Sequence, residues 1–323
     1  MSIEPDLLTA ARGGDSLAFD QLVAQFRGEL TAHCYRMLGS PHDAEDAVQE
    51  SLLNAWRGLS GFEGRSSLRT WLYRICTNAC LRLNTKRVLS PDHGPARHET
   101  DDLGEPLPGP WLEPWEDDPS ASYLRRESVE LAFVAALQHL PSTQRAVLIL
   151  RQVLEYSAAE TAEILDLTPA AVNSALQRAR KAVEERVPAR SQQAELSALG
   201  PDGQRELIDA FVAAWEKADV NAIVNLLAED VRFTMPPLPA WFDGRENVTR
   251  FLVERIFANS WRLVPVRANG QLAIAGYMRR PDGVFGLGGI NVLSLRDGLI
   301  TEISSFLSPE VLTRFDLPEI FSD

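Results

Sequence analysis

The hydrophobic pattern is helical up to about residue 204, whereas residues 204–323 add strand-like runs after two further helices, and this difference limits the folds that are open to the chain. Before residue 204, apolar residues such as Leu22, Phe26 and Leu30 recur near helical spacing. After it, apolar runs of strand length alternate with turn signals such as Asn269-Gly270 and Asp297-Gly298. We therefore expect helical domains followed by an α+β domain with an antiparallel, strongly curved sheet.

The length of 323 residues allows two or three domains, and segments rich in proline, glycine and polar residues divide the chain. The predicted parts are a helical domain at residues 5–87, an acidic Pro/Gly-rich linker at 88–126, a second helical domain at 127–187, a short linker at 188–203 and the α+β domain at 204–323.

Charge is distributed unevenly along the chain. Its 32 basic and 45 acidic residues give a net charge of −13, which argues against nucleic-acid binding by the surface as a whole. Yet no acidic residue lies between Glu63 and Asp92, or between Asp166 and Glu184, and both gaps contain arginine and lysine. Two basic faces on an acidic chain predict local contacts with DNA and a partner that supplies the remaining affinity.

The helix predicted after Thr168-Pro169 is the first candidate for contact with DNA. With the preceding short helix it has the proportions of a helix-turn-helix. One face of it is apolar, and the opposite face carries amides, a hydroxyl and cations that can pair with major-groove edges and phosphates. A solvated amphipathic helix is the alternative. The candidate residues are Asn173, Ser174, Gln177, Arg178 and Lys181.

The second candidate is the loop and helix from Gly58 to Arg87. Aromatic residues beside arginines suit stacking on unpaired bases and neutralisation of the backbone. The helical pattern leaves Arg69, Tyr73, Thr77, Asn78 and Arg82 outward, whereas core packing is the favoured interpretation for Trp71. Phe62, which lies in a loop between glycines, is expected to be exposed.

The helix that begins with Ser40 as N-cap and Pro41 in its first turn has an acidic edge. Asp46, Gln49 and Glu50 lie on one side of it. Such an edge is either solvated surface or a docking face for a basic partner.

Metal ions, cofactors and membranes are not expected. Three cysteines exclude a disulfide scaffold and fit a reducing compartment. Cys76 and Cys80, with His33-Cys34 upstream, are better explained as helix core than as a zinc site. No apolar run approaches the ~20 residues of a membrane span, and the N-terminus lacks the order of a signal peptide, so a cytoplasmic protein is expected.

For the last domain an intramolecular contact surface is the favoured interpretation, and a ligand-binding pocket without catalytic residues is the alternative. No pair among its candidates has a spacing that specifies acid/base chemistry, so the chain is not expected to be an enzyme. A small-molecule enzyme fused to a DNA-binding module is the alternative. The pocket candidates are Arg232, Trp241, Asp243, Trp261 and Tyr277.

Two long motifs resemble those of a known family. DAEDAVQESLLNAWRGLSGFEGRSSLRTWLYRICTNACLR is similar to region 2 of bacterial sigma factors of the extracytoplasmic-function (ECF) group. LPSTQRAVLILRQVLEYSAAETAEILDLTPAAVNSALQRARKAVEE is similar to their region 4, and the two together cover residues 15–187. The resemblance implies a dissociable subunit of RNA polymerase that reads the −10 promoter element with region 2 and the −35 element with region 4.

The resemblance also implies roles for residues. Asp43, Asp46, Gln49 and Glu50 would meet the clamp helices of the polymerase β′ subunit, and the β flap is a further expected contact. Asn173, Ser174, Gln177 and Arg178 match positions that face the −35 groove. Around the −10 element, Phe62, Ser66, Ser67 and Asn78 would lie near a flipped base, and Arg65, Arg69, Tyr73, Arg74 and Arg82 complete the expected DNA-binding set.

The last domain resembles SnoaL-like, ketosteroid-isomerase-like domains, which fold as a cone around a cavity. The segment Trp111-Leu112-Glu113-Pro114-Trp115 is similar to a Trp/Pro motif in the linker of sigma factors that carry this extension. The resemblance implies that the added domain regulates the sigma core within the same chain.

Overall fold

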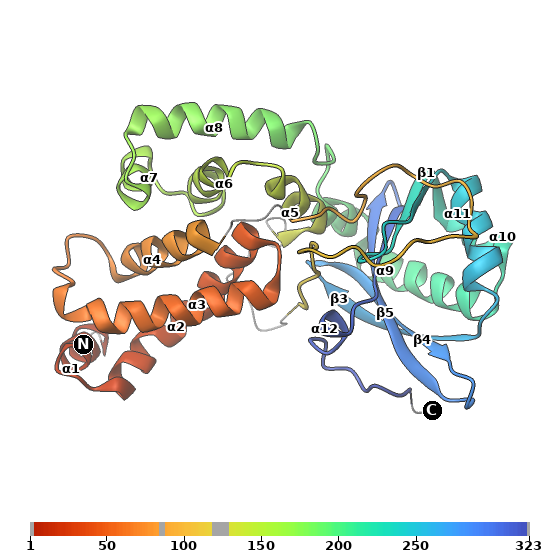
Figure 1. Ribbon diagram of the computed structural model, residues 1–323, viewed down its shortest axis with the longest axis horizontal. Coiled ribbons are helices and arrows are strands. Elements are labelled where there is room, and N and C mark those ends of the chain that lie inside the picture. The colour runs from red at the N-terminus through yellow and green to blue at the C-terminus, as the bar shows by residue number, and fades with distance from the viewer. Residues whose placement is uncertain (1–2, 84–87, 118–128, 322–323) are drawn as a thin grey trace. The chain divides into compact units, whose positions relative to one another are not determined.

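The computed structural model describes residues 3–83, 88–117 and 129–321, and the chain divides into two compact units (Figure 1). The first unit contains Met1–Val88 and Pro119–Val187, and the second contains Leu89–Asp118 and Pro188–Asp323. Both helical segments therefore belong to one unit, and most of the segment between them belongs to the other. None of the described helices is long and apolar enough to cross a membrane.

The first unit is helical, as expected. Its elements are α1 (Ile3–Arg12), α2 (Ser16–Leu38), α3 (Pro41–Gly58), the 3₁₀ turn η1 (Leu59–Gly61), α4 (Leu68–Leu83), α5 (Leu131–Gln138), α6 (Ser142–Leu148), the π-helical η3 (Ile149–Val153), α7 (Ala158–Leu165) and α8 (Pro169–Glu184).

Side-chain caps begin several of these helices at the positions that the sequence indicates. Ser40 accepts a hydrogen bond from the backbone N–H of Asp43, and Ser67 accepts one from Thr70. Thr168 accepts one from Ala171, with Pro169 in the first turn of α8. These bonds satisfy donors that a helix leaves unpaired at its N-terminus. By contrast, α6 begins at Ser142 after Pro141, without a side-chain cap.

The core between α2 and α4 contains a polar contact. The His33 Nε2 atom lies 2.8 Å from the Thr77 hydroxyl, and the His33 ring meets the ring of Tyr73 edge-on at 5.1 Å. All three side chains are buried. Burial, with further contributions from Arg36 and Arg69, lowers the pKa of His33 to about 3. His33 is therefore neutral in the folded unit.

The folded unit is expected to lose stability below about pH 6.5. The unfolded chain binds a proton at His33 near pH 6.5, whereas the folded unit resists it down to about pH 3. Between these values the free energy of unfolding should fall by up to about 1.4 kcal/mol per pH unit. His33→Gln should flatten this slope, measured by hydrogen exchange of α2 amides at pH 7.5 and 5. An unchanged slope in His33→Gln would contradict the assignment.

A buried arginine joins the later helices to the C-terminus of α2. The Arg145 guanidinium, which is 3 % exposed, donates to the carbonyl oxygen of Met37, to that of Leu140 (3.2 Å), and to the Gln138 side chain (2.5 Å). Gln138 in turn donates to the Arg36 carbonyl oxygen at 3.2 Å. Burial lowers the pKa of Arg145 to about 10, so it stays cationic at neutral pH beside the negative end of the α2 dipole.

The second unit combines helices with one sheet. Its elements are α9 (Gln192–Glu216), α10 (Val220–Leu226), β1 (Leu227–Thr234), β2 (Trp241–Asp243), α11 (Arg245–Phe251), the π-helical η4 (Leu252–Ile256), β3 (Trp261–Ala268), β4 (Gln271–Arg279), β5 (Phe285–Arg296), β6 (Leu299–Phe306) and α12 (Pro309–Leu312).

The sheet order is β2-β1-β6-β5-β4-β3. The expected turns are present: Asn269 and Gly270 both have positive φ between β3 and β4, as do Asp297 and Gly298 between β5 and β6. The expectation of a purely antiparallel sheet is wrong, because β1 and β6 pair in parallel. The long connection from β1 through β2, α11 and three further strands allows a parallel neighbour that no hairpin could give.

Much of the predicted acidic linker lies on this sheet domain. We call residues 89–117 the strap. The backbone of the strap pairs with the domain through several hydrogen bonds. Among them, the Arg97 N–H donates to the Trp241 carbonyl, the Leu107 N–H to the Pro237 carbonyl, and the Asn269 N–H to the Trp115 carbonyl, at 2.8, 3.0 and 2.8 Å. The remainder of the predicted linker at 88–126 lies outside the described residues from 118 onward.

The segment predicted as a second linker, residues 188–203, contains the start of α9. Gln192 exchanges hydrogen bonds with the Leu295 backbone at 2.6 and 3.0 Å, and Glu195 accepts from the Asp297 N–H at 2.9 Å. A kink at Gly200, with φ of 68°, separates this part from the rest of α9. The sheet domain is thus bonded to two segments that precede it in the chain, the strap and the start of α9.

Candidate nucleic-acid interface

Helix α8 presents a polar face on a short apolar core. Val172, Ala175 and Leu176 pack against α6 and α7 through Val147 and Ala162. Asp166, with φ of 55°, ends α7 in the left-handed conformation and turns the chain into α8. The five predicted DNA-contacting residues of α8 are all exposed: Asn173, Ser174, Gln177, Arg178 and Lys181.

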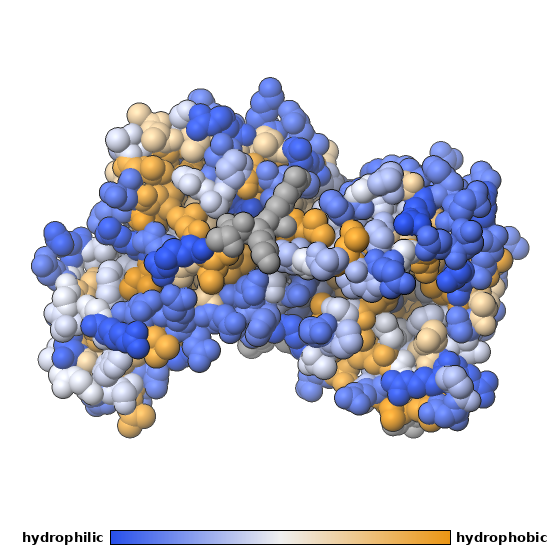
Figure 2. Space-filling model, viewed as in Figure 1, coloured by the Kyte–Doolittle hydropathy of each residue, from blue (hydrophilic) through white to orange (hydrophobic). Residues whose placement is uncertain are grey.

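The α8 face has hydrogen-bonding groups and positive charge side by side. The Arg178 guanidinium donates to the Ser174 hydroxyl at 2.7 Å. Figure 2 shows hydrophilic residues along the outer side of the C-terminal half of α8. Amide, hydroxyl and guanidinium groups on one open helix face are the groups that read base edges and phosphates in the major groove.

Helix α4 and the loop before it form a second basic surface. Arg65, Arg74 and Arg82 are exposed, as is Ser67, while Ser66 and Asn78 are half-buried. Arg65 pairs with Glu63 at 3.2 Å, and Arg82 pairs with Glu50 at 3.3 Å. Both are pairs between exposed side chains, which contribute little and exchange readily for phosphate.

Two aromatic residues lie deeper than expected. Tyr73 is fully buried between His33 and Tyr156, and Thr77 is buried with it, so the outward orientation expected for both is wrong. The sequence pattern assumed that only one face of α4 is covered, whereas the helix packs against α2, α3 and α7. Phe62 is also buried, and its ring lies 5.0 Å from that of Trp71.

Arg69 is part of a network rather than an open surface. It donates to both carboxylate oxygens of Glu29, at 2.8 to 3.1 Å, and its guanidinium lies 4.7 Å from the centre of the Tyr73 ring. Burial disfavours its charge, but the hydrogen bonds to Glu29 and the nearby phenols raise the pKa of Arg69 above its usual value. Arg69 also donates to the Tyr156 hydroxyl at 3.4 Å.

The acidic edge of α3 is open, as predicted. Asp43, Asp46, Gln49 and Glu50 are all exposed, while Ala44, Ala47 and Val48 of the same helix are buried. His42 lies 3.6 Å from Asp46. The acidic edge of α3 and the basic surface of α4 therefore lie on neighbouring helices, and the ion pair of Glu50 with Arg82 joins them.

The second unit contains a cavity of about 290 Å³. Of the five residues expected at a pocket, Trp261 lines this cavity. The other four are placed elsewhere: Arg232 lies between Asp92 of the strap and Glu302, Trp241 donates to the Gly94 carbonyl, Asp243 ends β2, and the Tyr277 hydroxyl donates to the Pro318 carbonyl.

Comparisons with known proteins agree with this arrangement. The chain matches the family models for Sigma-70 region 2 at residues 22–88, Sigma-70 region 4 at 130–183 and the SnoaL-like domain at 208–303. The helix-turn-helix, the two helical regions and the SnoaL-like domain together define a sigma factor of the Sigma-70 class.

Full-length relatives define the family more narrowly. The chain is 41% identical over 321 residues to the ECF RNA polymerase sigma factor SigG of Mycobacterium tuberculosis, covering 95% of this chain and 85% of the relative. It is 30% identical over 312 residues to SigJ of the same organism, covering 91% and 93%. The chain therefore belongs to the family of ECF RNA polymerase sigma factors. The crystal structure of SigJ has the same fold, with a TM-score of 0.63 at 23% identity over 92% of this chain and 100% of that one.

Proposed function

We propose that the protein binds core RNA polymerase and directs it to specific promoters. The observation that carries this proposal is the open amide-and-cation face of α8 on a chain with a net charge of −13 that belongs to the ECF family. A small basic face on an acidic body gives weak binding to DNA alone, because affinity grows with the number of neutralised phosphates. Polymerase supplies the remaining contacts.

Three surfaces divide the work in this proposal. The α3 edge of Asp43, Asp46, Gln49 and Glu50 binds the β′ clamp helices, and region 4 also meets the β flap. The exposed arginines of α4 and its loop neutralise the −10 backbone, and the α8 face reads the −35 groove. In this division Glu50 binds polymerase and Arg82 binds DNA. The ion pair between the two side chains supports it, because each becomes available when the other binds its own target.

Regions 2 and 4 must separate before both promoter elements are read. In this structure they form one unit, joined by Arg145 at the end of α2 and by the hydrogen bond between Arg69 and Tyr156. Tyr73 and Phe62 are buried in the same unit. We propose that this is the resting form and that binding to polymerase opens it.

The strap gives the SnoaL-like domain control over the opening. Leu89 and Trp111 form a bridge, with hydrogen bonds from the Leu89 N–H to the Pro110 carbonyl (2.8 Å) and from the Leu112 N–H to the Leu89 carbonyl (2.9 Å). The strap is thereby closed into a loop, and only residues 112–128 connect region 2 to region 4. At ~3.3 Å per residue these reach roughly 55 Å, whereas with the bridge broken the whole stretch 89–128 reaches roughly 130 Å.

Catalysis is not part of the proposal. Among the described residues, the lining of the cavity contains no aspartate, glutamate, histidine, cysteine, lysine or tyrosine. A general acid or base needs a group that titrates within reach of the substrate, and these are the side chains that serve. The lining therefore supports binding, and the alternative of a fused enzyme has no such support from it.

Replacing Gln177 and Arg178 together by alanine is expected to lower −35-dependent initiation about thirtyfold, because each lost base contact costs about 1–3 kcal/mol. The measurement is run-off transcription by holoenzyme from promoters mapped by sequencing the transcripts that it initiates. Arg27→Ala is the control, since Arg27 is exposed on α2 and pairs only weakly with Asp20 at 3.4 Å. Equal transcription by the double variant and the control would remove α8 from promoter recognition.

A further inference from the structure

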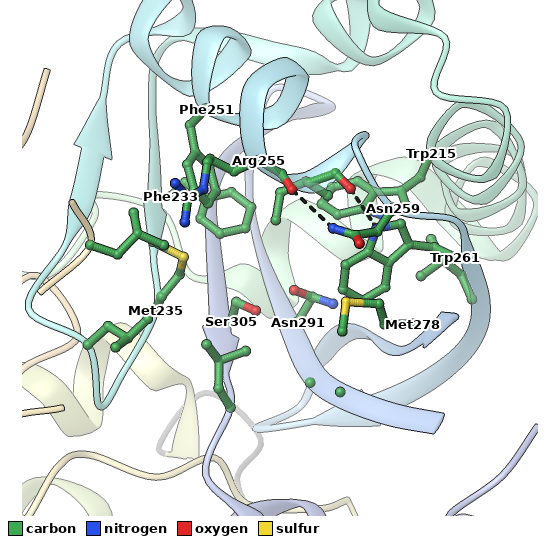
Figure 3. A pocket seen from close by; sticks show the side chains of 17 residues that line it. Trp215, Phe233, Met235, Phe251, Arg255, Asn259, Trp261, Met278, Asn291 and Ser305 are labelled. Atoms are coloured by element: carbon green, nitrogen blue, oxygen red, sulfur yellow. Dashed lines mark hydrogen bonds between the residues drawn. The ribbon is translucent and has the colours of Figure 1, made fainter. Parts of the chain in front are cut away.

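The cavity of the second unit is mainly apolar but has a polar floor. Asn291 on β5 and Ser305 on β6 are direct partners in the sheet register and lie side by side (Figure 3). The amide nitrogen of Asn291 donates to the Ile274 carbonyl at 3.2 Å, which leaves its oxygen for another group. Within the described residues, neither this oxygen nor the Ser305 hydroxyl has a hydrogen-bond partner.

The walls around this floor are flat and apolar. Trp215, Phe233 and Trp261 contribute rings, and Gly288 and Gly289 leave space where side chains would stand. The indole N–H of Trp215 is buried and has no partner among the described residues. Rings with a few fixed hydrogen-bonding groups are the usual lining of a small-molecule site.

Of the described residues that line the cavity, Arg255 is the one with a charged side chain. It is exposed and comes from η4, so it stands at the mouth rather than on the floor. Figure 3 shows it across the cavity from Asn291 and Ser305. A cation at the mouth, with no carboxylate in the lining, favours an anionic group at one end of a ligand.

The strap supplies part of the wall. Leu103 lines the cavity, although it lies more than a hundred residues before the other lining residues. Nearby strap residues are bonded to η4, the helix that carries Arg255. The Thr100 hydroxyl donates to Glu254, and Arg255 donates to the Asp101 carbonyl at 3.5 Å. A molecule in the cavity therefore contacts both the SnoaL-like domain and the strap.

We propose that the cavity binds a flat, mainly apolar molecule of one to three rings with a carboxylate or similar anion at one end, and that this molecule holds the strap on the domain. The rings lie between Trp215, Phe233 and Trp261, a polar atom meets Asn291 and Ser305, and the anion faces Arg255. Leu103 closes the remaining side. The inference goes beyond the proposed role in transcription, and its test does not use polymerase.

The test of the site uses 2-naphthoate and its neutral analogue 2-naphthamide as probes of the full-length protein, with isothermal titration calorimetry. Arg255→Gln is expected to weaken 2-naphthoate about tenfold and to leave 2-naphthamide unchanged. Arg279→Gln is the matched control, because Arg279 is exposed on β4 and does not line the cavity. The absence of saturable binding of either probe, or equal losses in both variants, would overturn the site.

The test of the strap compares two leucines of the same segment. Leu103→Ala is expected to weaken 2-naphthoate about fivefold, whereas Leu107→Ala, which lies outside the lining, should change it less than twofold. In the wild-type protein, saturating 2-naphthoate should slow hydrogen exchange of the Arg97 and Leu107 amides at least threefold, since both are bonded to the domain. Unchanged exchange under saturation would overturn the holding of the strap.

Discussion

Replacing Arg145 by methionine is expected to lower the free energy of unfolding of the first unit by about 3 kcal/mol. Methionine keeps most of the volume but leaves the carbonyl groups of Met37 and Leu140 and the Gln138 side chain without their donor. Leaving a buried acceptor without its donor costs about 1–3 kcal/mol, and several acceptors are affected here. The measurement is hydrogen exchange of the last-turn amides of α2 and of α5 and α6 amides.

The control for this prediction is Arg27→Met, which removes an exposed arginine from α2 and should cost less than about 1 kcal/mol. A second outcome is informative about the resting form. If Arg145 joins regions 2 and 4, the exchange of α5 and α6 amides should rise more than that of α3 amides. Equal changes throughout the first unit, or a loss no greater than that of the control, would contradict the role of Arg145.

The helix starts and the hairpins were predictable because their signals are local. Ser40 with Pro41, and Thr168 with Pro169, cap helices by bonds that span three residues. Asn269-Gly270 and Asp297-Gly298 select positive φ within a turn of two residues. The buried stripe of α8 was predictable for the same reason, since one helix period determines it.

Features that depend on distant partners were not predictable from the sequence. Tyr73 is buried because Tyr156, far along the chain, packs against it. The parallel pairing of β1 with β6 joins strands that are far apart in the sequence, which no turn signal records. Proline and acidic residues in the strap indicated a linker, yet several of its bonds to the domain are backbone bonds, which carry no composition signal.

Most residues of the cavity could not be predicted from the sequence for the same reason, because distant segments bring them together. Asn291 and Ser305 are neighbours only through the register of β5 with β6, and Leu103 reaches the lining only through the course of the strap. The aromatic and charged residues chosen from sequence, Arg232 and Tyr277 among them, are instead engaged by the strap and by the C-terminal segment. A polar residue inside an apolar strand, such as Asn291 in GINVLSL, was the one available signal.

The attachment of the strap is expected to limit transcription by holoenzyme. Weakening its attachment is expected to raise transcription by holoenzyme several-fold, because regions 2 and 4 then separate without removing a bound domain. Asp92→Ala removes the pair with Arg232, whose atoms are 3.0 Å apart. Asn269→Gly keeps the positive φ of the turn but removes the oxygen that accepts from the Trp115 N–H at 2.9 Å. Lower transcription by this double variant would contradict the direction of control.

A disulfide that fixes the strap to the domain should have the opposite effect, lower transcription, and can be reversed by reduction in the same protein. Glu116 and Ala268 form an isolated antiparallel bridge, flanked by the bonds from Asp117 to Arg267 and from Asn269 to Trp115. They are thus a pair without direct hydrogen bonds, with Cα atoms expected ~4.5 Å apart, which suits a disulfide. The three natural cysteines are buried, so a Glu116→Cys/Ala268→Cys variant forms its bond at this site.

The most direct measurement of the central claim is run-off transcription by holoenzyme containing this variant, before and after reduction. We expect about tenfold less transcript from the oxidised protein, with full recovery on reduction, and no redox effect in Glu116→Cys alone. Equal transcription by the oxidised and reduced forms would show that the strap need not leave the SnoaL-like domain, and would rule out its control of transcription.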